Sequence, residues 1–332
     1  MLLKQLFDAE TSTYTYLLAD PETGEAAIID PVLEQVERDA TLVDELGLSL
    51  RYVLETHLHA DHVTGSGRLR VRTGALTAVS AAAEVACADL SLTHGDVLPL
   101  GRHRIEVRST PGHTDGCVTY VVEADGQTFA FTGDALLIRG CGRTDFQQGD
   151  AATLYRSVHE QIFSLPPETV IYPGHDYRGH SASTVAEERA HNPRLRDGID
   201  EAAFIGIMGR LTLSQPRRIH EALPANQVCG MPRLAEVEAG ALSMSEAVRI
   251  VDVRTSAEFD GPLGHLPGAV LAPLNQLDGV VESWPRATPL LLVCRSGQRS
   301  AVACQRLIAM GFTDVTNLTG GMLAWRATQG VA

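Results

Sequence analysis

The stretch Thr56-His57-Leu58-His59-Ala60-Asp61-His62 places three imidazoles and one carboxylate on a single short segment. It directly follows the run Arg51-Tyr52-Val53-Leu54-Glu55, whose aromatic and β-branched residues are typical of a buried strand. The polar residues should therefore lie on the loop at the C-terminal end of that strand, where open α/β sheets place their ligand sites. Imidazole nitrogen and carboxylate oxygen are ligands for zinc and iron, so the stretch predicts a metal site.

Three further segments end an apolar run with a residue that can bind a metal. They are Thr110-Pro111-Gly112-His113-Thr114, Thr132-Gly133-Asp134 and Tyr172-Pro173-Gly174-His175-Asp176. The glycines allow tight turns and close approach of the backbone. Each motif alone is a weak signal, because a histidine beside a glycine is more often an ordinary loop residue. In this order, together with the first stretch, they strongly support the metal site.

Length and composition limit the class of protein. The 332 residues predict two domains, and the hydrophobic share of 44% and charged share of 20% are ordinary for a globular protein. The formal net charge of -14 argues against nucleic-acid or anionic membrane partners. No apolar run approaches the roughly 20 residues needed to cross a bilayer. The first ten residues lack the features of a secretory signal.

The cysteines and the periodicity complete the outline of the chain. Six scattered cysteines indicate a reducing compartment, and we expect a cytoplasmic protein. Apolar periodicity supports a first domain over 1–213, fades over a proline-punctuated linker at 214–232, and resumes in a second domain over 233–332. In the second domain, strands at 248–253, 290–293 and 315–318 alternate with helical patterns, which predicts a small parallel α/β domain.

Residues 1–210 resemble the metallo-β-lactamase fold, an αββα sandwich with its metal site at one edge of the sheets. Most members of this superfamily are hydrolases with two metals. The resemblance implies that one metal takes His57, His59 and His113, that the other takes Asp61, His62 and His175, and that Asp134 bridges them. All seven residues are present, so the set of ligands alone leaves the reaction open.

The stretch Ile138-Arg139-Gly140-Cys141-Gly142-Arg143-Thr144-Asp145-Phe146-Gln147-Gln148-Gly149 narrows the choice. Together with 56–67 and 172–177, it resembles the persulfide dioxygenase branch, the type linked to ethylmalonic encephalopathy. The resemblance implies one iron(II) per chain on His57, His113 and Asp134, an arrangement that leaves open positions for substrate sulfur and O2. The remaining four residues would form a hydrogen-bond network around these ligands; they are His59, Asp61, His62 and His175.

The same branch oxidises glutathione persulfide with O2 to sulfite and glutathione, and its members are often dimers or tetramers. We therefore expect these substrates and a homo-oligomer. Glutathione carries two carboxylates and one ammonium group, and arginine suits its carboxylates. Arg143 and Arg194 occupy positions that the family uses for the substrate, and Tyr177 lies near the site with a hydroxyl to donate. The alternative for both arginines is a solvated surface charge. We assign no catalytic role to Cys141.

A second candidate site is Cys294-Arg295-Ser296-Gly297-Gln298-Arg299-Ser300, which follows the apolar run Leu290-Leu291-Leu292-Val293 and begins a helical pattern. Backbone amides, a helix N-terminus and two guanidiniums near one cysteine stabilise a thiolate and bind anions. Cys87, Cys117 and Cys304 lie among apolar or small residues and are interpreted as packing. Cys229 falls in the expected linker and is uninformative.

The second site resembles the active-site loop of a single-domain rhodanese. Supporting stretches are Val251-Asp252-Val253-Arg254, Gly264-His265-Leu266-Pro267-Gly268-Ala269 and Gly320-Gly321-Met322. The resemblance implies a persulfide on Cys294, with Arg295 and Arg299 orienting thiosulfate or stabilising the persulfide. Asp252 and Arg254 are expected to brace the loop.

The combined hypothesis is a bifunctional sulfur-oxidation enzyme. A rhodanese domain can make glutathione persulfide from thiosulfate and glutathione, and a persulfide dioxygenase can consume it. The first alternative is a di-zinc glutathione thioester hydrolase of the glyoxalase II kind, which shares all the ligands. The second alternative is that the C-terminal domain is a sulfur carrier or a docking module.

Overall fold

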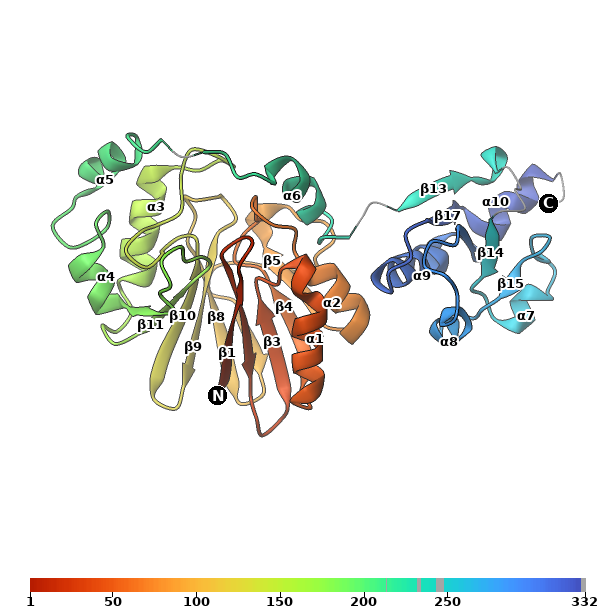
Figure 1. The fold of residues 1–332 in the computed structure, drawn as a ribbon, viewed down its shortest axis with the longest axis horizontal. Helices are drawn as coiled ribbons and strands as arrows, with labels where there is room; N and C mark the ends of the chain where they lie inside the picture. The colour runs from red at the N-terminus through yellow and green to blue at the C-terminus, as the bar shows by residue number, and fades with distance from the viewer. Residues whose placement is uncertain (213, 232–233, 243–247, 330–332) are drawn as a thin grey trace. The chain divides into compact units, whose positions relative to one another are not determined.

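A computed structural model of the chain describes residues 1–212, 214–231, 234–242 and 248–329. The chain forms two compact units, Met1–Met231 and Pro232–Ala332, each described here by itself (Figure 1). The expected linker at 214–232 is wrong for most of its length, because 214–231 belong to the first unit and contain the helix α6 (Ile219–Asn226). Pro224 lies inside α6. Proline has a low helix propensity, but packing against the rest of the unit outweighs it here. The sequence pattern alone therefore gave Pro224 too much weight as a helix breaker.

Two six-stranded sheets form the centre of the first unit. The first sheet has the order β1-β2-β3-β4-β5-β6 and contains β1 (Leu2–Asp8), β2 (Thr13–Ala19), β3 (Glu25–Ile29), β4 (Ser49–Leu54), β5 (Leu76–Ser80) and β6 (Leu90–Leu92). The second has the order β12-β11-β10-β9-β8-β7 and contains β7 (Val97–Leu100), β8 (His103–Ser109), β9 (Val118–Ala124), β10 (Gln127–Gly133), β11 (Val170–Pro173) and β12 (Ser183–Thr184).

Helices cover the outer faces of both sheets. The remaining helices of this unit are α1 (Val36–Glu45), α2 (Ser66–Thr73), α3 (Ala151–Ser157), α4 (Val185–His191) and α5 (Glu201–Met208), and α3 continues as one π-helical turn (Val158–Ile162). In Figure 1, α1 and α2 lie on the side of the first sheet and α3 to α5 on the side of the second. This arrangement is the αββα sandwich that the sequence predicts.

The alternation of side chains along β2 shows how the layers are held together. Tyr16 and Leu18 face the space between the sheets, where they pack with Phe131 of β10. Leu17 points the other way and packs with Val36 of α1. Because both faces of β2 are covered, the strand is apolar almost throughout. Burial of each large side chain contributes about 1.5–3 kcal/mol.

The second unit is built on one parallel sheet of order β13-β17-β16-β14-β15, in which every described pair of strands is parallel. Its elements are β13 (Ala235–Glu238), β14 (Arg249–Asp252), α7 (Ser256–Phe259), β15 (Val270–Leu271), α8 (Leu277–Val281), β16 (Leu290–Val293), α9 (Gln298–Ala309), β17 (Val315–Thr319) and α10 (Gly321–Thr328). The expected parallel α/β architecture is therefore confirmed.

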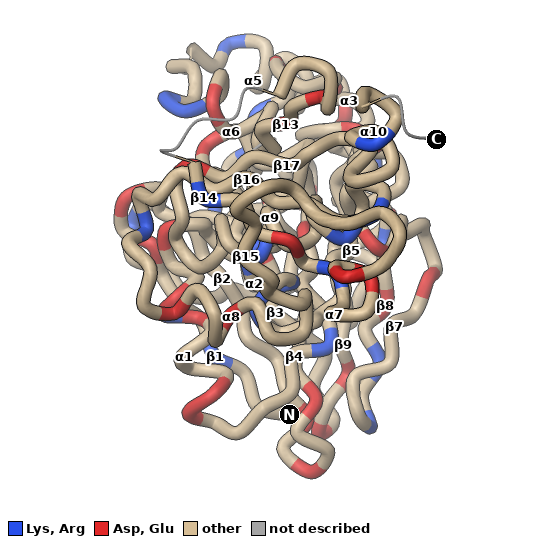
Figure 2. Tube along the Cα trace, turned by 90° about the vertical axis from the view of Figure 1, so that its right-hand side faces the viewer, with Lys and Arg blue, Asp and Glu red and all other residues tan. Residues whose placement is uncertain are grey.

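Two features of the whole chain bear on the sequence predictions. No helix in the described residues combines the length and the apolar character that a membrane span needs. Figure 2 shows acidic and basic residues interspersed along the trace of the described chain.

The cysteine prediction needs one correction. Cys87 and Cys229, separated by 142 residues, form a disulfide with their Cα atoms 6.0 Å apart. Cys87 was expected to serve packing alone. The sequence could not reveal the pair, because the segment that carries Cys229 reaches Cys87 only after it folds back onto the first unit. Cys117 and Cys304 are buried free thiols, as expected.

Among the residues that the structure describes, Arg254 is the largest with a fully buried side chain. Its guanidinium binds both carboxylate oxygens of Asp252 and donates to the carbonyl oxygens of Glu258 and Gly264. A buried charge of this kind is tolerated only because each of its donors has a partner. The pair therefore ties β14 to α7 and to the loop that follows α7.

Replacement of Arg254 by Met should destabilise the second unit by about 3–5 kcal/mol, because it leaves the Asp252 carboxylate buried without its partner. Both tryptophans, Trp284 and Trp325, lie in the second unit, so denaturant unfolding followed by tryptophan fluorescence reports on this unit alone. The control is Arg286→Met, which removes an exposed guanidinium over the Phe312 ring and should cost less than about 1 kcal/mol. Equal stability losses in the two variants would contradict the bracing role.

Candidate functional site

The residues expected to bind a metal follow the C-terminal ends of four strands of the first unit. The histidine-rich loop follows β4, His113 follows β8, Asp134 follows β10 and His175 follows β11. Gly133 adopts a positive φ of 49°, and a Cβ there would collide with the Thr56 side chain. The strand ends therefore bring together residues that are far apart in the sequence.

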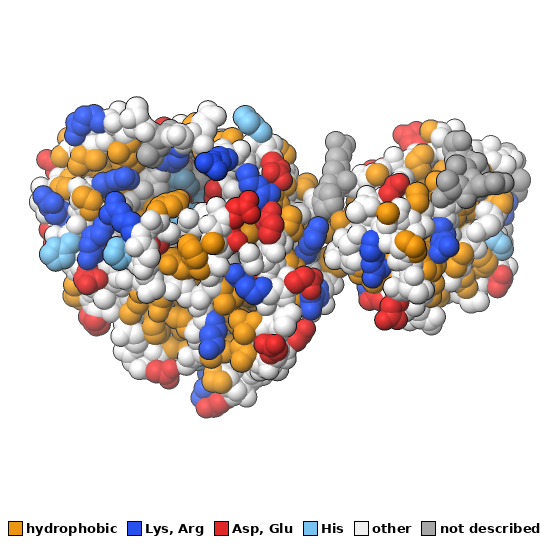
Figure 3. Space-filling model, in the orientation of Figure 1, with side chains coloured by type: hydrophobic (Ala, Val, Ile, Leu, Met, Phe, Trp, Pro, Cys, Tyr) orange, Lys and Arg blue, Asp and Glu red, His pale blue; other side chains and the backbone are white. Residues whose placement is uncertain are grey.

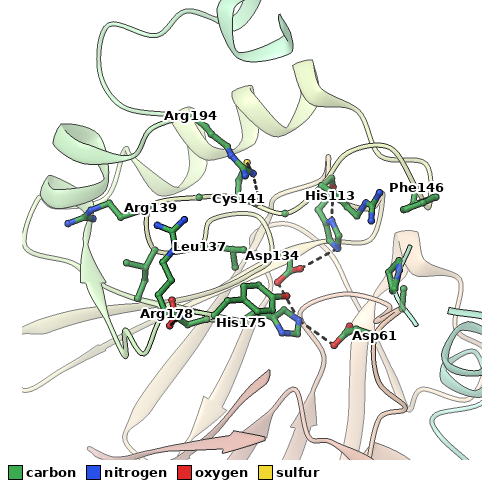
Figure 4. Close-up of a pocket in the computed structure, with 18 of the residues that line it drawn as sticks. Asp61, His113, Asp134, Leu137, Arg139, Cys141, Phe146, His175, Arg178 and Arg194 are labelled. Carbon is green, nitrogen blue, oxygen red and sulfur yellow. Dashed lines mark hydrogen bonds and ion pairs between the residues drawn. The ribbon is translucent and has the colours of Figure 1, made fainter. Parts of the chain in front are cut away.

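The first group of possible metal ligands is His57, His113 and Asp134, whose donor atoms all lie within 4.8 Å of one another. The ring centroids of the two histidines are 5.0 Å apart, with the rings nearly perpendicular at 82°. The His113 Nε2 atom lies 3.6 Å from Asp134 Oδ2, and Figure 4 shows these two side chains directed toward each other.

Hydrogen bonds determine which nitrogen of His57 is available. The Thr56 hydroxyl donates to Asp30 Oδ2 at 2.7 Å, so its oxygen is left to accept from His57 Nδ1 at 3.0 Å. His57 Nδ1 therefore carries the proton, and Nε2 keeps its lone pair. Burial, with smaller effects from His59 and His113, holds the pKa of His57 well below its usual range. The ring is thus neutral, as metal binding requires.

The same logic applies to His113. Its Nδ1 lies 2.7 Å from the backbone carbonyl oxygen of Arg143, which can only accept a hydrogen bond. His113 Nδ1 therefore donates, and Nε2 is available toward Asp134. Gly142 allows this contact, because a Cβ there would lie 2.8 Å from His113 Nδ1. The stretch 138–149 thus contributes a backbone carbonyl that orients a possible ligand.

The chemistry of this group fits a divalent metal. Two neutral imidazoles and one carboxylate are the donor set of the facial arrangement used by non-haem iron(II). Asp134 Oδ1 is buried and, among the residues that the structure describes, has no hydrogen-bond partner; His175 Nε2 lies 3.7 Å from it. A buried carboxylate oxygen is costly without a partner, and a cation at this point would supply one.

A second group, His59, Asp61 and His175, also has donor atoms within 4.8 Å of one another. His175 Nε2 lies 3.5 Å from Asp61 Oδ2, and His62 Nδ1 lies 3.0 Å from the same oxygen. Although burial opposes the shift, His62 and His175 lower the pKa of Asp61 well below its usual range. Three of the four residues expected to surround the first ligands, His59, His62 and His175, therefore gather around the fourth, Asp61.

Two carboxylates behind His59 escaped the sequence analysis. His59 Nε2 lies 3.2 Å from Asp30 Oδ1 and 3.4 Å from Glu55 Oε2, and all three residues are buried. Although burial lowers it, these carboxylates raise the pKa of His59 well above its usual range. Asp30 directly follows the apolar strand β3, and this signal could have identified it. Glu55 directly follows the strand β4 and carries the same signal.

A cavity of about 450 Å³ opens beside the two groups. Among the residues that line it are four arginines, Arg139, Arg143, Arg178 and Arg194. Figure 4 shows Arg178 and Arg194 on different sides of the space above Asp134, and Figure 3 shows basic side chains gathered on the first unit over α4 and α5. The cavity therefore offers positive charge to an anionic ligand despite the net negative charge of the chain.

Both arginines expected to contact substrate lie at this cavity. Arg143 forms a bidentate pair with Asp145, at 2.6 and 2.7 Å, and stacks over the Phe146 ring. Arg194 donates to the Cys141 carbonyl oxygen at 3.1 Å. Tyr177 is 71% exposed and its ring is parallel to that of His175, with the centroids 6.0 Å apart. The sequence analysis did not select Arg178.

Cys141 lies beside the cavity but is buried. Burial raises the pKa of its thiol to about 11, only partly opposed by Arg194. It therefore remains a thiol at neutral pH, in agreement with the absence of a catalytic assignment.

In the second unit, Cys294 directly follows β16, and the loop that it begins turns around its sulfur. Gly297 N–H donates to Cys294 Sγ at 3.2 Å. The Ser300 hydroxyl lies 3.4 Å from this sulfur, and its nearest acceptor is Asn317 Oδ1 at 2.6 Å. Burial alone would raise the pKa of Cys294, but Ser300 and the amides of Ser296 and Gly297 leave it below its usual value. Gly297 has a φ of 90°, which the tight loop requires.

The arginines of this loop differ in their surroundings. Arg299 forms a bidentate pair with Glu258, at 2.6 and 2.8 Å, whereas Arg295 is exposed. Because Arg254 binds the Glu258 carbonyl, the buried Asp252–Arg254 pair braces the residue that holds Arg299. Asp252 and Arg254 therefore brace the Cys294 loop only indirectly, through Glu258 and Arg299.

Comparison with known proteins identifies both domains. The Metallo-beta-lactamase superfamily profile matches residues 9–175, and the Rhodanese-like domain profile matches residues 237–328. The human protein named mitochondrial persulfide dioxygenase ETHE1 is 54% identical over 231 residues, which cover 70% of this chain and 89% of that protein.

Two crystal structures extend the comparison. That of ETHE1 from Myxococcus xanthus has a TM-score of 0.66 and 50% identity, and the match covers 69% of this chain and 100% of that one. A metallo-beta-lactamase from Staphylococcus aureus has a TM-score of 0.63 and 23% identity, covers 96% of this chain and 98% of that one, and supports the fold alone. The expected cytoplasmic location stays a prediction. The chain belongs to the persulfide dioxygenase family of the metallo-β-lactamase superfamily and carries a C-terminal rhodanese-like domain.

Proposed function

We propose that the chain oxidises glutathione persulfide with O2 in its first unit and transfers sulfur between thiosulfate and glutathione in its second. The observation that carries the first assignment is the group of His57, His113 and Asp134, of which His113 and Asp134 line a cavity that four arginines also line. The second assignment rests on the hydrogen bonds that stabilise the Cys294 thiolate.

In the first unit, His57, His113 and Asp134 would hold one iron(II). When bound, this metal supplies positions for the persulfide sulfur and for O2. The protein contributes the rest: Thr56 and the Arg143 carbonyl keep each Nε2 unprotonated, and the buried Asp134 oxygen supplies negative charge. The donor set is therefore ready before the metal arrives, which reduces the cost of binding.

Arg143, Arg194 and Tyr177 would bind glutathione persulfide. The two arginines suit its carboxylates, and the exposed Tyr177 hydroxyl can donate to it. Asp145 and Phe146 hold the Arg143 side chain in place, so little conformational freedom is lost when the substrate binds. The reaction is balanced as glutathione persulfide, O2 and water giving glutathione and sulfurous acid, which ionises to sulfite.

In the second unit, the Cys294 thiolate would attack the outer sulfur of thiosulfate. The sulfur–sulfur bond of thiosulfate breaks, sulfite leaves with the electron pair, and Cys294 becomes a persulfide. A glutathione thiolate then takes the outer sulfur, which gives glutathione persulfide and restores the Cys294 thiolate. Arg299 and Arg295 would orient thiosulfate, and the amides around Cys294 hold the negative charge.

One observation favours the two-metal hydrolase as a second candidate. The donors of His59, Asp61 and His175 lie as close together as those of the first group. Asp30 and Glu55 lie beside His59 Nε2 and leave Nδ1, 4.0 Å from Asp61 Oδ1, as the nitrogen that faces this second group. The metal content of the protein distinguishes the candidates.

We expect about one iron per chain in protein purified without oxygen, and oxygen uptake with glutathione persulfide that a chelator abolishes and iron(II) restores. His113→Ala should lose both iron and uptake, because it removes a donor from the metal group. The measurements are elemental analysis and oxygen consumption with sulfite quantified. Two zinc ions per chain, together with thioester hydrolysis, would instead establish the hydrolase.

Cys294→Ser should abolish oxygen uptake that depends on thiosulfate and glutathione, while uptake with added glutathione persulfide stays at the wild-type rate. The serine hydroxyl is not ionised at neutral pH and is a poor sulfur acceptor. Cys304→Ser serves as the control, since it removes another thiol of the second unit. A loss of both activities in Cys294→Ser would count against separate roles for the two units. No sulfur transfer by the wild-type chain would favour the carrier or docking role.

Ser300→Ala should shift the pH profile of sulfur transfer toward higher pH. The Ser300 hydroxyl lowers the pKa of Cys294, and only the thiolate reacts. Without this donor the thiolate forms at a higher pH, so the rate should fall most at low pH and approach that of the wild type at alkaline pH. Ser283→Ala, at an exposed position of the same unit, is the control. An unchanged profile in Ser300→Ala would show that the other donors suffice.

A further inference from the structure

The end of α6 and the segment after it support the histidine-rich loop, and the mechanism above does not use them. Asn226, the last residue of α6, has a side chain that is only 3% exposed. Its Nδ2 donates to the carbonyl oxygens of His59 at 2.8 Å and His62 at 2.9 Å, and its Oδ1 accepts from Thr64 N–H at 2.8 Å. One amide side chain thus satisfies three backbone groups of the loop.

These bonds matter because the loop has no helix or strand of its own from His57 to Val63. Buried backbone groups outside regular structure need other partners. Asn226 supplies them from more than 160 positions away in the sequence. The carbonyl groups it binds belong to the same short loop that carries His57, so it helps to determine where the His57 ring lies.

The backbone of the residues after Asn226 also packs closely against the end of the histidine-rich loop and the start of α2. Cys229 accepts a hydrogen bond from Gly67 N–H at 2.9 Å, at the start of α2 (Figure 1). A Cβ at Gly67 would lie 2.6 Å from that carbonyl oxygen, and one at Gly230 would collide with the Thr64 carbonyl. The segment therefore has little space in which to shift.

The Cys87–Cys229 disulfide lies only three residues beyond Asn226. It joins this segment to the loop that follows β5, and a small cavity of about 20 Å³ between them is lined by His57, His59, Asn226 and Cys229, among others. Cys229 is buried, whereas Cys87 is only partly buried and so offers the more accessible sulfur of the pair. The disulfide can therefore fasten the segment, and it can be opened from outside.

We propose that Asn226 is a positioning residue for the metal centre, and that the Cys87–Cys229 disulfide latches it in place so that metal retention depends on the redox state of the pair. The proposal rests on the metal centre of the proposed function but not on its dioxygenase activity. It assigns a role to two cysteines that the sulfur chemistry leaves unused.

The reductant is a low-molecular-weight thiol such as glutathione. Its thiolate attacks Cys87 Sγ, the Cys87–Cys229 bond breaks, and Cys229 leaves as a thiolate that takes a proton. A second glutathione thiolate attacks the mixed disulfide and releases Cys87, which also takes a proton. Two electrons pass to the protein, and two glutathione molecules become glutathione disulfide. Excess glutathione disulfide drives the reverse reaction.

The first test compares Asn226→Ala and Asn226→Asp with the wild type, using cobalt(II) as the probe. The asparagine amide donors are absent from both variants, whereas the aspartate keeps an acceptor for Thr64. We expect both to bind cobalt(II) about 10- to 100-fold more weakly and to change its visible absorption spectrum, as loss of a group that orients metal ligands does. Gln227→Ala, at the exposed neighbouring position, should match the wild type.

A merely structural Asn226 would lower the melting temperature but leave the cobalt(II) affinity and spectrum unchanged. Cobalt(II) affinities of both variants within twofold of the wild type would overturn the positioning role. These readouts need no turnover, so failure of the proposed function would show separately, as absent oxygen uptake in protein that still binds metal.

The second test examines the latch in the folded wild type and in Cys87→Ser, and it stands even if the Asn226 variants fail to fold. The folded wild type is first treated with glutathione disulfide or with reductant, and its free thiols are then counted after denaturation. We expect four free thiols per chain in the oxidised protein and six in the reduced protein. Reduced wild type and Cys87→Ser should release iron(II) to a chelator faster than oxidised wild type, and reductant should not change release from Cys87→Ser. Six thiols after oxidation, or equal release from all forms, would overturn the latch.

Discussion

The hydrogen bond from the Thr56 hydroxyl to Asp30 is the interaction on which the metal centre depends. Because the hydroxyl donates to this buried carboxylate, it can only accept from His57, and the ring is thereby left with a free Nε2. Asp30 also accepts from Thr56 N–H and faces His59, so one carboxylate at the end of β3 organises the start of the whole loop. The αββα sandwich matters for function because it brings β3 and β4 side by side.

The two units prepare their reactive atoms by opposite means. In the first unit, hydrogen-bond acceptors such as the Arg143 carbonyl hold the imidazole proton on Nδ1 and leave Nε2, which would face a metal, unprotonated. In the second, donors gather around Cys294 and hold its negative charge. Both solutions place the reactive residue just beyond a buried strand, where backbone groups of a tight loop can reach it. Each loop therefore performs chemistry because a rigid sheet holds its ends.

The predictive value of the sequence differed from element to element. The strands before the two sites, the order of the ligand-bearing segments and the parallel second unit followed from local patterns of apolar residues. The helix α6 did not, because Pro224 and the fading periodicity resemble a linker. Nor did the Cys87–Cys229 pair, whose 142-residue separation carries no local signal.

Local sequence alone determined which residue types stand at the ends of buried strands, and with them the two candidate chemistries, because strand period and turn glycines are read from near neighbours. Only the tertiary structure decided which nitrogen of each histidine is free, which carboxylates face His59, and that Asn226 closes the back of the loop. Those facts depend on contacts between residues distant in sequence, such as Asn226 and His59. Directional hydrogen bonds require distances within a few tenths of an ångström, and only the folded chain sets them.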